Sequence, residues 1–438
     1  MANTYLTRTF SSAGNRKKWT WSAWIKRSSG LGSQQCLLAC SSGATVFHLV
    51  YFDGNDKLNH NYNQTYCNTE RVFRDTSGWY HLVCAVDTTQ STASNRVKFY
   101  VNGVQETLSG NFPSQNTDMT INNNVRHDIS NGGANFNGQF YFDGLMSHIH
   151  FCDGYQYQAS DFGETDATTG EWKINTSPSV SYGTNGFFIL KDGNTVTDSS
   201  SNSNTWTANG TLTKTEDCPD NVFATLNPLV SITDAPTFSN GNNSIVISNA
   251  GGFGSQSTLG MSSGKYYAEF KMTASSDNDM AVGVNSDTDA PRTDSGAGFG
   301  SNSTGYRETG TLAVNGTEDI SYGNSYTVND IIGIAIDLDN NKLYFSINGT
   351  FQNSGDPTSG ATGTGAISIS APATGFYHFA TGNILTSGTI TAQSNFGQGY
   401  FGTTQVASAG TAPSEGGIFE YDCPSGYQAL CTKGINSF

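Results

Sequence analysis

The sequence lacks any long apolar run. Nowhere does it hold the about 18 consecutive apolar residues that a membrane-spanning helix needs. Its first segment, MANTYLTRTFSSAGNRKKW, has basic residues but not the apolar stretch of a secretory signal. We therefore expect a protein that is made in a cytosol and inserts into no membrane.

Charged residues are also scarce, at 13% of the chain, and cationic residues are the scarcer kind. The 21 Lys and Arg residues against 36 Asp and Glu residues give a formal net charge of -15. Nucleic-acid phosphates and anionic membranes would repel such a protein. We expect neither as a partner, which leaves carbohydrates and proteins.

Catalytic signatures are missing as well. A glycoside hydrolase needs two carboxylates beside the scissile bond, and the ExDxxE arrangement that would place them on one strand is absent. Glu164 and Asp166 come closest, but they lie in the turn-rich stretch GETDATTG. There is no GxSxG turn between a strand and a helix, and no glycine-rich phosphate loop with a lysine. We therefore expect that the protein is not an enzyme.

No CxxC pair occurs among the eight cysteines, whose spacing is irregular. A chain of 438 residues is large enough to fold without covalent staples. We expect free, mostly buried thiols rather than a disulfide framework or a zinc site. The cysteines are Cys36, Cys40, Cys67, Cys84, Cys152, Cys218, Cys423 and Cys431.

Glycine and aromatic residues, in contrast, are abundant. The chain has 50 glycines and 12% aromatic residues, and it shows no long amphipathic helical pattern. This composition is typical of many short strands joined by tight turns, so we predict an all-β fold. The length exceeds that of a single core, and two or three domains are expected.

The clearest strand signal is DIIGIAIDLDNNKLYFSINGT, residues 330–350. Apolar residues alternate with others before and after the turn formers DNN, and the stretch closes on Asn348-Gly349. A similar order of strand, polar loop, strand and Asn-Gly runs from Trp79 to Gly103. Because a lone hairpin cannot bury its apolar face, these patterns predict two sandwich-like modules.

We expect the first module to span residues 1–160. The region Asp53–Arg71 is rich in Asn and Tyr, which predicts a polar loop system at one rim of the sandwich. Strands are expected from Lys17 in KWTWSAWIKRS and at Gln35–Cys40, Thr45–Tyr51, Trp79–Asp87, Arg96–Val101 and Phe140–Phe151.

Three stretches of this module resemble a known family. SAWIKRS, then GWYHLVCAVD with RVKFYVNGV, then FNGQFYFDGLMSHIHFCDGYQYQASDFG, are similar to the laminin-G-like, concanavalin A-type jelly roll. The resemblance implies a two-sheet jelly-roll sandwich of roughly a dozen strands.

Residues 161–230 are expected to form a connector, a long strap laid over the first module. Apolar residues are sparse there, and Pro219 and Pro228 interrupt any strand. A jelly roll followed by GTNGF, the exit FATLNPL and further β modules is similar to structural proteins of marine tailed bacteriophages.

Residues 231–402 are expected to form the second module. GKYYAEFKM, AVGVN, the 330–350 hairpin, GFYHFATGN and SNFGQGYF resemble a SPRY-type β-sandwich in this order, which implies protein binding through loops at one edge. Residues 403–438 resemble the tail that follows this module in the same phage proteins. Phe419, Tyr421 and Tyr427 make the tail too apolar to be free, so we expect it to dock on its own chain or on a neighbouring subunit.

The resemblance implies a non-enzymatic virion structural protein of a tailed phage, most of all a tail-fibre or adhesion protein that contacts a host-surface glycan or protein. The expected partners are other virion proteins and copies of the chain itself. A trimer is the family-level expectation, although no coiled-coil heptads supply a stalk. The alternatives are a capsid decoration or head-fibre protein and, in another class, a secreted bacterial glycan-binding adhesin.

Two groups of residues are candidate glycan or receptor contacts. Sugars bind to aromatic faces and to amides that reach their hydroxyls. Packing under the connector or at a subunit contact is the alternative for either group. The first group is Asn59, Asn61, Tyr62 and Tyr66 in the expected rim loops, and the second is Tyr155 and Tyr157 after the last jelly-roll strand.

Two sets of residues are candidate metal ligands, although no cofactor is required. Asp53, Asp143 and Asp153 each precede a glycine, where a carboxylate could hold a structural calcium or could simply form the turn. His148 and His150 form His-x-His on one face of a strand, and a metal would need a third ligand. Packing of these histidines outward or toward the connector is the alternative.

Overall fold

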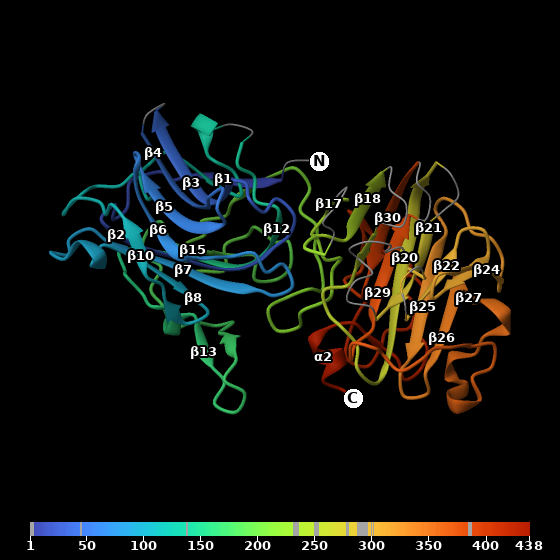
Figure 1. The fold of residues 1–438 in the computed structure, drawn as a ribbon. Helices are drawn as coiled ribbons and strands as arrows, with labels where there is room; N and C mark the ends of the chain where they lie inside the picture. The colour runs from blue at the N-terminus through green and yellow to red at the C-terminus, as the bar shows by residue number, and fades with distance from the viewer. Residues whose placement is uncertain are drawn as a thin grey trace. The chain divides into compact units, whose positions relative to one another are not determined.

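The computed structural model describes residues 4–43, 46–136, 139–230, 236–248, 254–276, 280–286, 297–298, 300, 302–383 and 388–438. The chain is almost entirely β-structure, as predicted, and it divides into two compact units (Figure 1). Unit 1 is Met1–Lys214 and unit 2 is Thr215–Phe438. The boundary lies inside the expected connector.

The larger sheet of unit 1 has eight strands in the order β10-β6-β5-β4-β3-β11-β1-β16. The second sheet of unit 1 packs against one face of this larger sheet, and we call the opposite face the outer face. The bounds are β1 (Tyr5–Thr9), β3 (Gln35–Gly43), β4 (Val46–Phe52), β5 (Lys57–Tyr62), β6 (Thr65–Val72), β10 (Leu108–Gly110), β11 (Arg126–Ile129) and β16 (Thr207–Asn209).

The second sheet of unit 1 has the order β15-β12-β2-β7-β8-β9. Trp19 and Trp21 of β2 are fully buried between the sheets, as the alternation in KWTWSAWIKRS predicts. The bounds are β2 (Lys18–Arg27), β7 (Tyr80–Asp87), β8 (Val97–Val101), β9 (Val104–Gln105), β12 (Gly144–Asp153) and β15 (Phe187–Ile189), with 3₁₀ turns η1 (Ala93–Asn95), η2 (Ala134–Phe136) and η3 (Ala159–Asp161).

The first part of the expected connector is integral to unit 1. β15 pairs with β12 and β16 pairs with β1, so this segment adds one strand to each sheet. Its Phe187 and Trp206 lie in the core. A separate hairpin, β13 (Gly163–Thr165) with β14 (Trp172–Ile174), projects from the sandwich (Figure 1). Only a glycine fits at Gly103, because a Cβ there would lie 2.5 Å from the Trp172 ring.

The prediction of rim loops at Asp53–Arg71 is wrong, because this region forms the β5–β6 hairpin. Asn63 and Gln64 connect the strands, both with positive φ, 48° and 67°. Two such residues in succession match a type I′ turn, which suits the twist of a hairpin. Gln64 replaces the glycine that normally signals this turn, and the alternation of apolar and polar residues around it is weak.

Unit 2 is a second sandwich. One sheet runs β17-β18-β30-β20-β25-β26-β27, with β28 on β26 and β33 on β20, and the other runs β19-β29-β21-β22-β23-β24. The predicted 330–350 hairpin is confirmed as β25 and β26, and every residue of β25 is buried. The bounds are β17 (Thr237–Ser239), β18 (Ser244–Ser248), β19 (Gly254–Gln256), β20 (Lys265–Ser275), β21 (Met280–Asn285), β22 (Ser303–Arg307), β23 (Thr311–Val314), β24 (Thr317–Ser321), β25 (Ile331–Asp337), β26 (Lys342–Ile347), β27 (Thr350–Phe351), η4 (Gln352–Ser354), η5 (Pro357–Thr362), β28 (Ile367–Ser368), β29 (His378–Asn383), β30 (Thr389–Asn395), β31 (Tyr400–Phe401), β32 (Thr404–Gln405), β33 (Gln428–Ala429) and α2 (Thr432–Ile435).

The C-terminal tail docks on its own chain. β33 pairs in parallel with β20, and Phe419 and Tyr427 are 1% exposed in a cluster with Tyr267 and Tyr344. The carboxylate of Glu269 on β20 lies beneath the tail. It accepts backbone N–H groups of Glu420 and Tyr421, each at 2.9 Å, and the side-chain amide of Asn395 at 3.2 Å.

The buried carboxyl of Glu269 should make unit 2 pH-sensitive. Burial raises its pKa from an ordinary 4.5 to about 7, against the opposing effect of the tail N–H groups. A raised folded-state pKa contributes stability that is full below about pH 4.5 and is lost as pH rises through about 7. We expect the unfolding free energy of unit 2 to fall by about 3 kcal/mol across that window. Urea titrations followed by circular dichroism at several pH values measure it.

The variant Glu269→Gln cannot titrate, so its unfolding free energy should change less with pH over the same window. An equal pH dependence in this variant and in the parent chain would assign the effect to another group.

Candidate functional site

A polar patch crosses three neighbouring strands on the outer face of unit 1. Cross-strand pairing places Tyr51 opposite Asn59 and Asn59 opposite Asn68, and it places Asn61 opposite Tyr66. Because side chains alternate along a strand, all five share the face that points away from the core. We call these five residues the tyrosine–asparagine face.

Asn59 stands out within the tyrosine–asparagine face. Its side chain is 3% exposed, and its Oδ1 has no hydrogen-bond partner among the described residues. An unpaired buried carbonyl oxygen costs about 1–3 kcal/mol. Because this oxygen has almost no exposed surface, a ligand reaches it only if the groups that cover it move aside.

The other members of the face offer both a ring and amides. Tyr66 is 50% exposed. Asn61 Oδ1 accepts the Gln64 N–H at 3.0 Å, and Asn68 Oδ1 accepts the Ser109 hydroxyl at 3.3 Å. Burial raises the pKa of Tyr51, whose phenol bonds to the Asn61 side chain. The face thus combines one open aromatic ring with a row of neutral polar groups.

Tyr62 does not belong with the other three residues of its predicted group. It points to the opposite side of β5, where its hydroxyl donates to Asp118 O at 3.2 Å and its ring packs against the core. Strand alternation separates it from Asn59, Asn61 and Tyr66. The odd and even positions of Asn59, Asn61 and Tyr62 are visible in the sequence. They indicate opposite faces only once β5 is recognised as a strand.

Tyr155 and Tyr157 form a stacked pair after β12, with ring centroids 5.4 Å apart. Tyr157 is half-buried, and its hydroxyl accepts the Ser181 N–H at 2.9 Å. Tyr155 is 41% exposed. The pair offers the exposed ring of Tyr155.

Hydrogen bonds within the chain engage all three candidate calcium ligands. Asp53 accepts backbone N–H groups of Asn55 and Lys57, and Asp143 bonds to the Ser29 hydroxyl. Burial raises the pKa of Asp143. No group of three or more His, Cys, Asp or Glu residues suited to a metal ion occurs in the part of the chain that the structure describes.

Asp153 is the most constrained of the three aspartates. Its carboxylate accepts the Asn15 N–H at 2.7 Å, the Asn122 amide at 2.6 Å and the Asn185 N–H at 3.1 Å. These donors hold together the start of β2, the loop before β11 and the segment before β15. Asp153 is the last residue of β12, and its carboxylate joins these three segments rather than forming a turn of its own.

His148 and His150 both pack against Phe188 of β15, at centroid distances of 5.7 Å and 3.9 Å. Their Nδ1 atoms pair with the hydroxyls of Ser147 and Tyr182. Burial lowers the pKa of His148 to about 4 and lowers that of His150 as well. They therefore face the segment that we expected to be the connector, as neutral packed rings.

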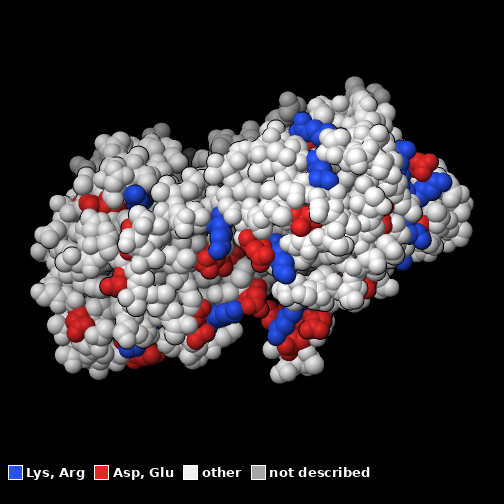
Figure 2. Space-filling model, turned by 180° about the vertical axis from the view of Figure 1, so that it is seen from behind, with Lys and Arg blue, Asp and Glu red and all other residues white. Residues whose placement is uncertain are grey.

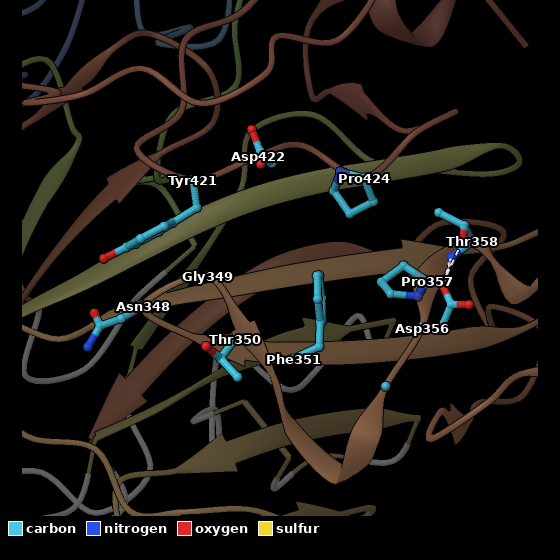
Figure 3. A pocket seen from close by; sticks show the side chains of 11 residues that line it. Asn348, Gly349, Thr350, Phe351, Asp356, Pro357, Thr358, Tyr421, Asp422 and Pro424 are labelled. Carbon is cyan, nitrogen blue, oxygen red and sulfur yellow. Dashed lines mark hydrogen bonds between the residues drawn. The ribbon is translucent and has the colours of Figure 1, made fainter.

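Unit 2 has a groove of about 530 Å³ that the sequence did not signal. The turn after β26 and the start of η5 form one side, and the docked tail forms the other (Figure 3). Only a glycine at position 349 lets the tail lie so close, since a Cβ there would be 2.6 Å from the Tyr421 ring. The lining residues are Asn348, Gly349, Thr350, Phe351, Gly355, Asp356, Pro357, Thr358, Tyr421, Asp422 and Pro424.

The distribution of charge and the state of the cysteines can be compared with the expectations from the sequence. On the face shown in Figure 2, charged side chains form small mixed groups rather than a broad basic patch. All eight cysteines are free thiols, and seven of them are buried. Among the described helices, none has the length and apolarity to cross a bilayer.

Comparisons with known proteins identify both modules. A laminin-G-type model, described as the concanavalin A-like lectin/glucanases superfamily, matches residues 2–159, and the SPRY domain model matches residues 265–371. A search of curated proteins finds no match. The chain thus carries a concanavalin A-like domain and then a SPRY domain, which confirms the predicted fold. These two domain types indicate a binding or adhesion role.

Similar solved structures come from several organisms. The SPRY domain of human HERC1 is 18% identical and covers 39% of this chain and 96% of its own, with a TM-score of 0.30. A candidate carbohydrate-binding protein from Bacteroides ovatus is 15% identical, and the match covers 48% of this chain and 56% of that protein, with a TM-score of 0.33. A heptameric SAP-like pentraxin from Limulus polyphemus is 14% identical, and the match covers 35% of this chain and 71% of the pentraxin, with a TM-score of 0.28.

Proposed function

We propose that this chain, with its concanavalin A-like and SPRY domains, is a non-enzymatic adhesion protein that binds an uncharged glycan on the tyrosine–asparagine face. The observation that carries the proposal is the half-exposed ring of Tyr66, which shares its face with the partly exposed amides of Asn61 and Asn68. An apolar sugar face stacks on an aromatic ring while its hydroxyls bond to amides.

The amides of Asn61 and Asn68 suit sugar hydroxyls, because both residues are partly exposed. They supply donors and acceptors that carry no charge, so they favour neutral groups that can both donate and accept hydrogen bonds. Tyr66 stands opposite Asn61 on the neighbouring strand. A pyranose lying on Tyr66 would bring its hydroxyls to the amides.

A Ser–His pair in unit 1 does not favour hydrolysis. Ser22 Oγ lies 2.9 Å from His81 Nε2, but Trp172 Nε1–H donates to His81 Nδ1 at 3.0 Å. With Nδ1 occupied as an acceptor, the neutral ring carries its proton on Nε2 and donates to Ser22. It therefore cannot accept the serine proton as a general base would. Burial also lowers the pKa of His81 to about 3.

A glycan array probed with the labelled full chain tests the proposal, followed by titration of the best binder. We expect Tyr66→Ala and Asn68→Ala each to weaken binding about tenfold, because one loses the stacking ring and the other a partly exposed amide. Tyr66→Phe keeps the ring and should retain most of the affinity.

Tyr155→Ala is the matched control, since it removes an exposed tyrosine ring from the same unit. It should bind as the parent does. Loss of binding in Tyr155→Ala with full binding in Tyr66→Ala would move the site to the stacked pair. Release of reducing sugar from a bound polysaccharide would contradict the non-enzymatic proposal.

In its finer form, the proposal is a tail-fibre or adhesion protein of a tailed-phage virion that assembles with itself and with other virion proteins. Its support is the order of a jelly roll, GTNGF, FATLNPL and a SPRY domain in one chain. Immunogold electron microscopy with an antibody to unit 2 tests it on virions. Label on the tail supports it, whereas label on the head favours a decoration protein, and a cell-surface signal on bacteria favours an adhesin.

A further inference from the structure

The groove of unit 2 has two sides of different origin, and each side carries apolar groups. Figure 3 shows Tyr421 and Pro424 of the tail along one side, and Phe351 and Pro357 along the other. Pro357 is buried, while Phe351, Tyr421 and Pro424 are partly exposed. Rings and prolines of this kind form surfaces on which extended peptide segments dock.

The charged groups of the groove all have one sign. Asp356 and Asp422 are exposed members of its lining, which contains no Lys, Arg or His. Oδ1 of each carboxylate already accepts a backbone hydrogen bond. Asp356 accepts the Thr358 N–H at 2.9 Å, and Asp422 accepts the Thr411 N–H at 2.6 Å. Their negative charge is complementary to a cationic side chain, and Phe351 and Tyr421 offer ring faces that attract the same cation.

We propose that this groove binds an extended segment of a partner protein that carries an arginine or lysine. The cation would lie between the aromatic rings and the two carboxylates, and the neighbouring residues would lie on the prolines. Because the tail builds one wall, this site exists only when the tail is docked. It belongs to unit 2, whereas the tyrosine–asparagine face belongs to unit 1.

Fluorescence anisotropy with the full chain and labelled eight-residue peptides tests the proposal. Each peptide combines alanine, proline and tyrosine with one arginine, and its matched partner has glutamine at that position. We expect the arginine peptides to bind at least about fivefold more tightly than their glutamine partners, with the difference shrinking as salt is added. Equal binding of the two sets, or no binding by either set, would overturn the proposal.

Asn substitutions isolate the charges and leave the local hydrogen bonds in place. Asp356→Asn and Asp422→Asn keep the Oδ1 acceptor, so the bonds from Thr358 and Thr411 should remain. Each should weaken arginine-peptide binding about threefold to fivefold, and Phe351→Ala should weaken it by a similar factor.

Asp339→Asn is the control for net charge, because Asp339 is an exposed residue whose Oδ1 accepts the Gly264 N–H at 2.9 Å, outside the groove lining. It should leave peptide binding unchanged, as should Tyr66→Ala in unit 1. If Asp339→Asn weakens binding as much as the groove variants do, attraction to the whole acidic chain explains the effect and the site is refuted.

Discussion

A chain that ends at Gly417 is expected to lose the fold of unit 2 while unit 1 keeps its cooperative transition. The deletion removes Phe419, Tyr427 and Leu430, none of them more than 1% exposed. Each large buried apolar side chain contributes about 1.5–3 kcal/mol, and whole domains are stable by only about 5–15 kcal/mol. The deletion also takes two N–H donors from the buried carboxylate of Glu269.

Tryptophan fluorescence separates the two units in this experiment. All six tryptophans lie in unit 1, at positions 19, 21, 24, 79, 172 and 206. Their emission should report an unchanged thermal transition in the shortened chain. Circular dichroism and limited proteolysis should show that the second transition and the protected fragment of unit 2 are gone.

A chain that ends at Ile435 is the matched control. It lacks only Asn436, Ser437 and Phe438, which are all exposed. It should retain both transitions. A protease-resistant unit 2 in the chain ending at Gly417 would show that the tail covers an already stable sandwich.

The second large effect is expected from Asp56→Ala in unit 1. Asp56 Oδ1 lies 3.0 Å from Arg27 Nη1, and both residues are 1% exposed. Asp56 also accepts the Gly32 N–H at 2.8 Å. Removing the carboxylate leaves a buried guanidinium without its countercharge, which costs about 3–5 kcal/mol. The midpoint of the tryptophan transition should fall by roughly 6–20 °C.

Arg74→Ala tests whether burial decides the size of that effect. Arg74 Nε donates to the same carboxylate at 2.8 Å, but its side chain is 58% exposed. Exposed ion pairs contribute about 0–1 kcal/mol, so the midpoint should hardly move. If the two variants lowered it equally, the carboxylate would be stabilising the surface loop rather than Arg27.

Strands with a strong alternation of apolar and other residues could be predicted from the sequence alone. The 330–350 stretch has isoleucines at every second position and an Asn-Gly turn, so its hairpin could be expected without any tertiary information. β5 and β6 have polar residues on one face and a turn without glycine, so composition alone suggested loops. The short strand Phe187–Ile189 is recognisable only from its partner β12.

The residues of the candidate site could be predicted in part from the sequence. Asn59, Asn61 and Tyr66 were chosen for their chemistry, and the structure brings them together on one face. The burial of Asn59 depends on surrounding chain and could not be derived from its neighbours in sequence. The groove of unit 2 joins Phe351 to Tyr421, residues 70 positions apart, and no local pattern links them.

The parallel pairing of β33 with β20 has a consequence for synthesis. The tail leaves the ribosome after every other strand of unit 2, yet it completes the sheet beside β20. Unit 1 can fold while translation continues, because its last strand, β16, ends at Asn209. Unit 2 must hold its apolar strands unfinished until the tail emerges, and in that interval its exposed apolar surface and unpaired strand edge favour aggregation.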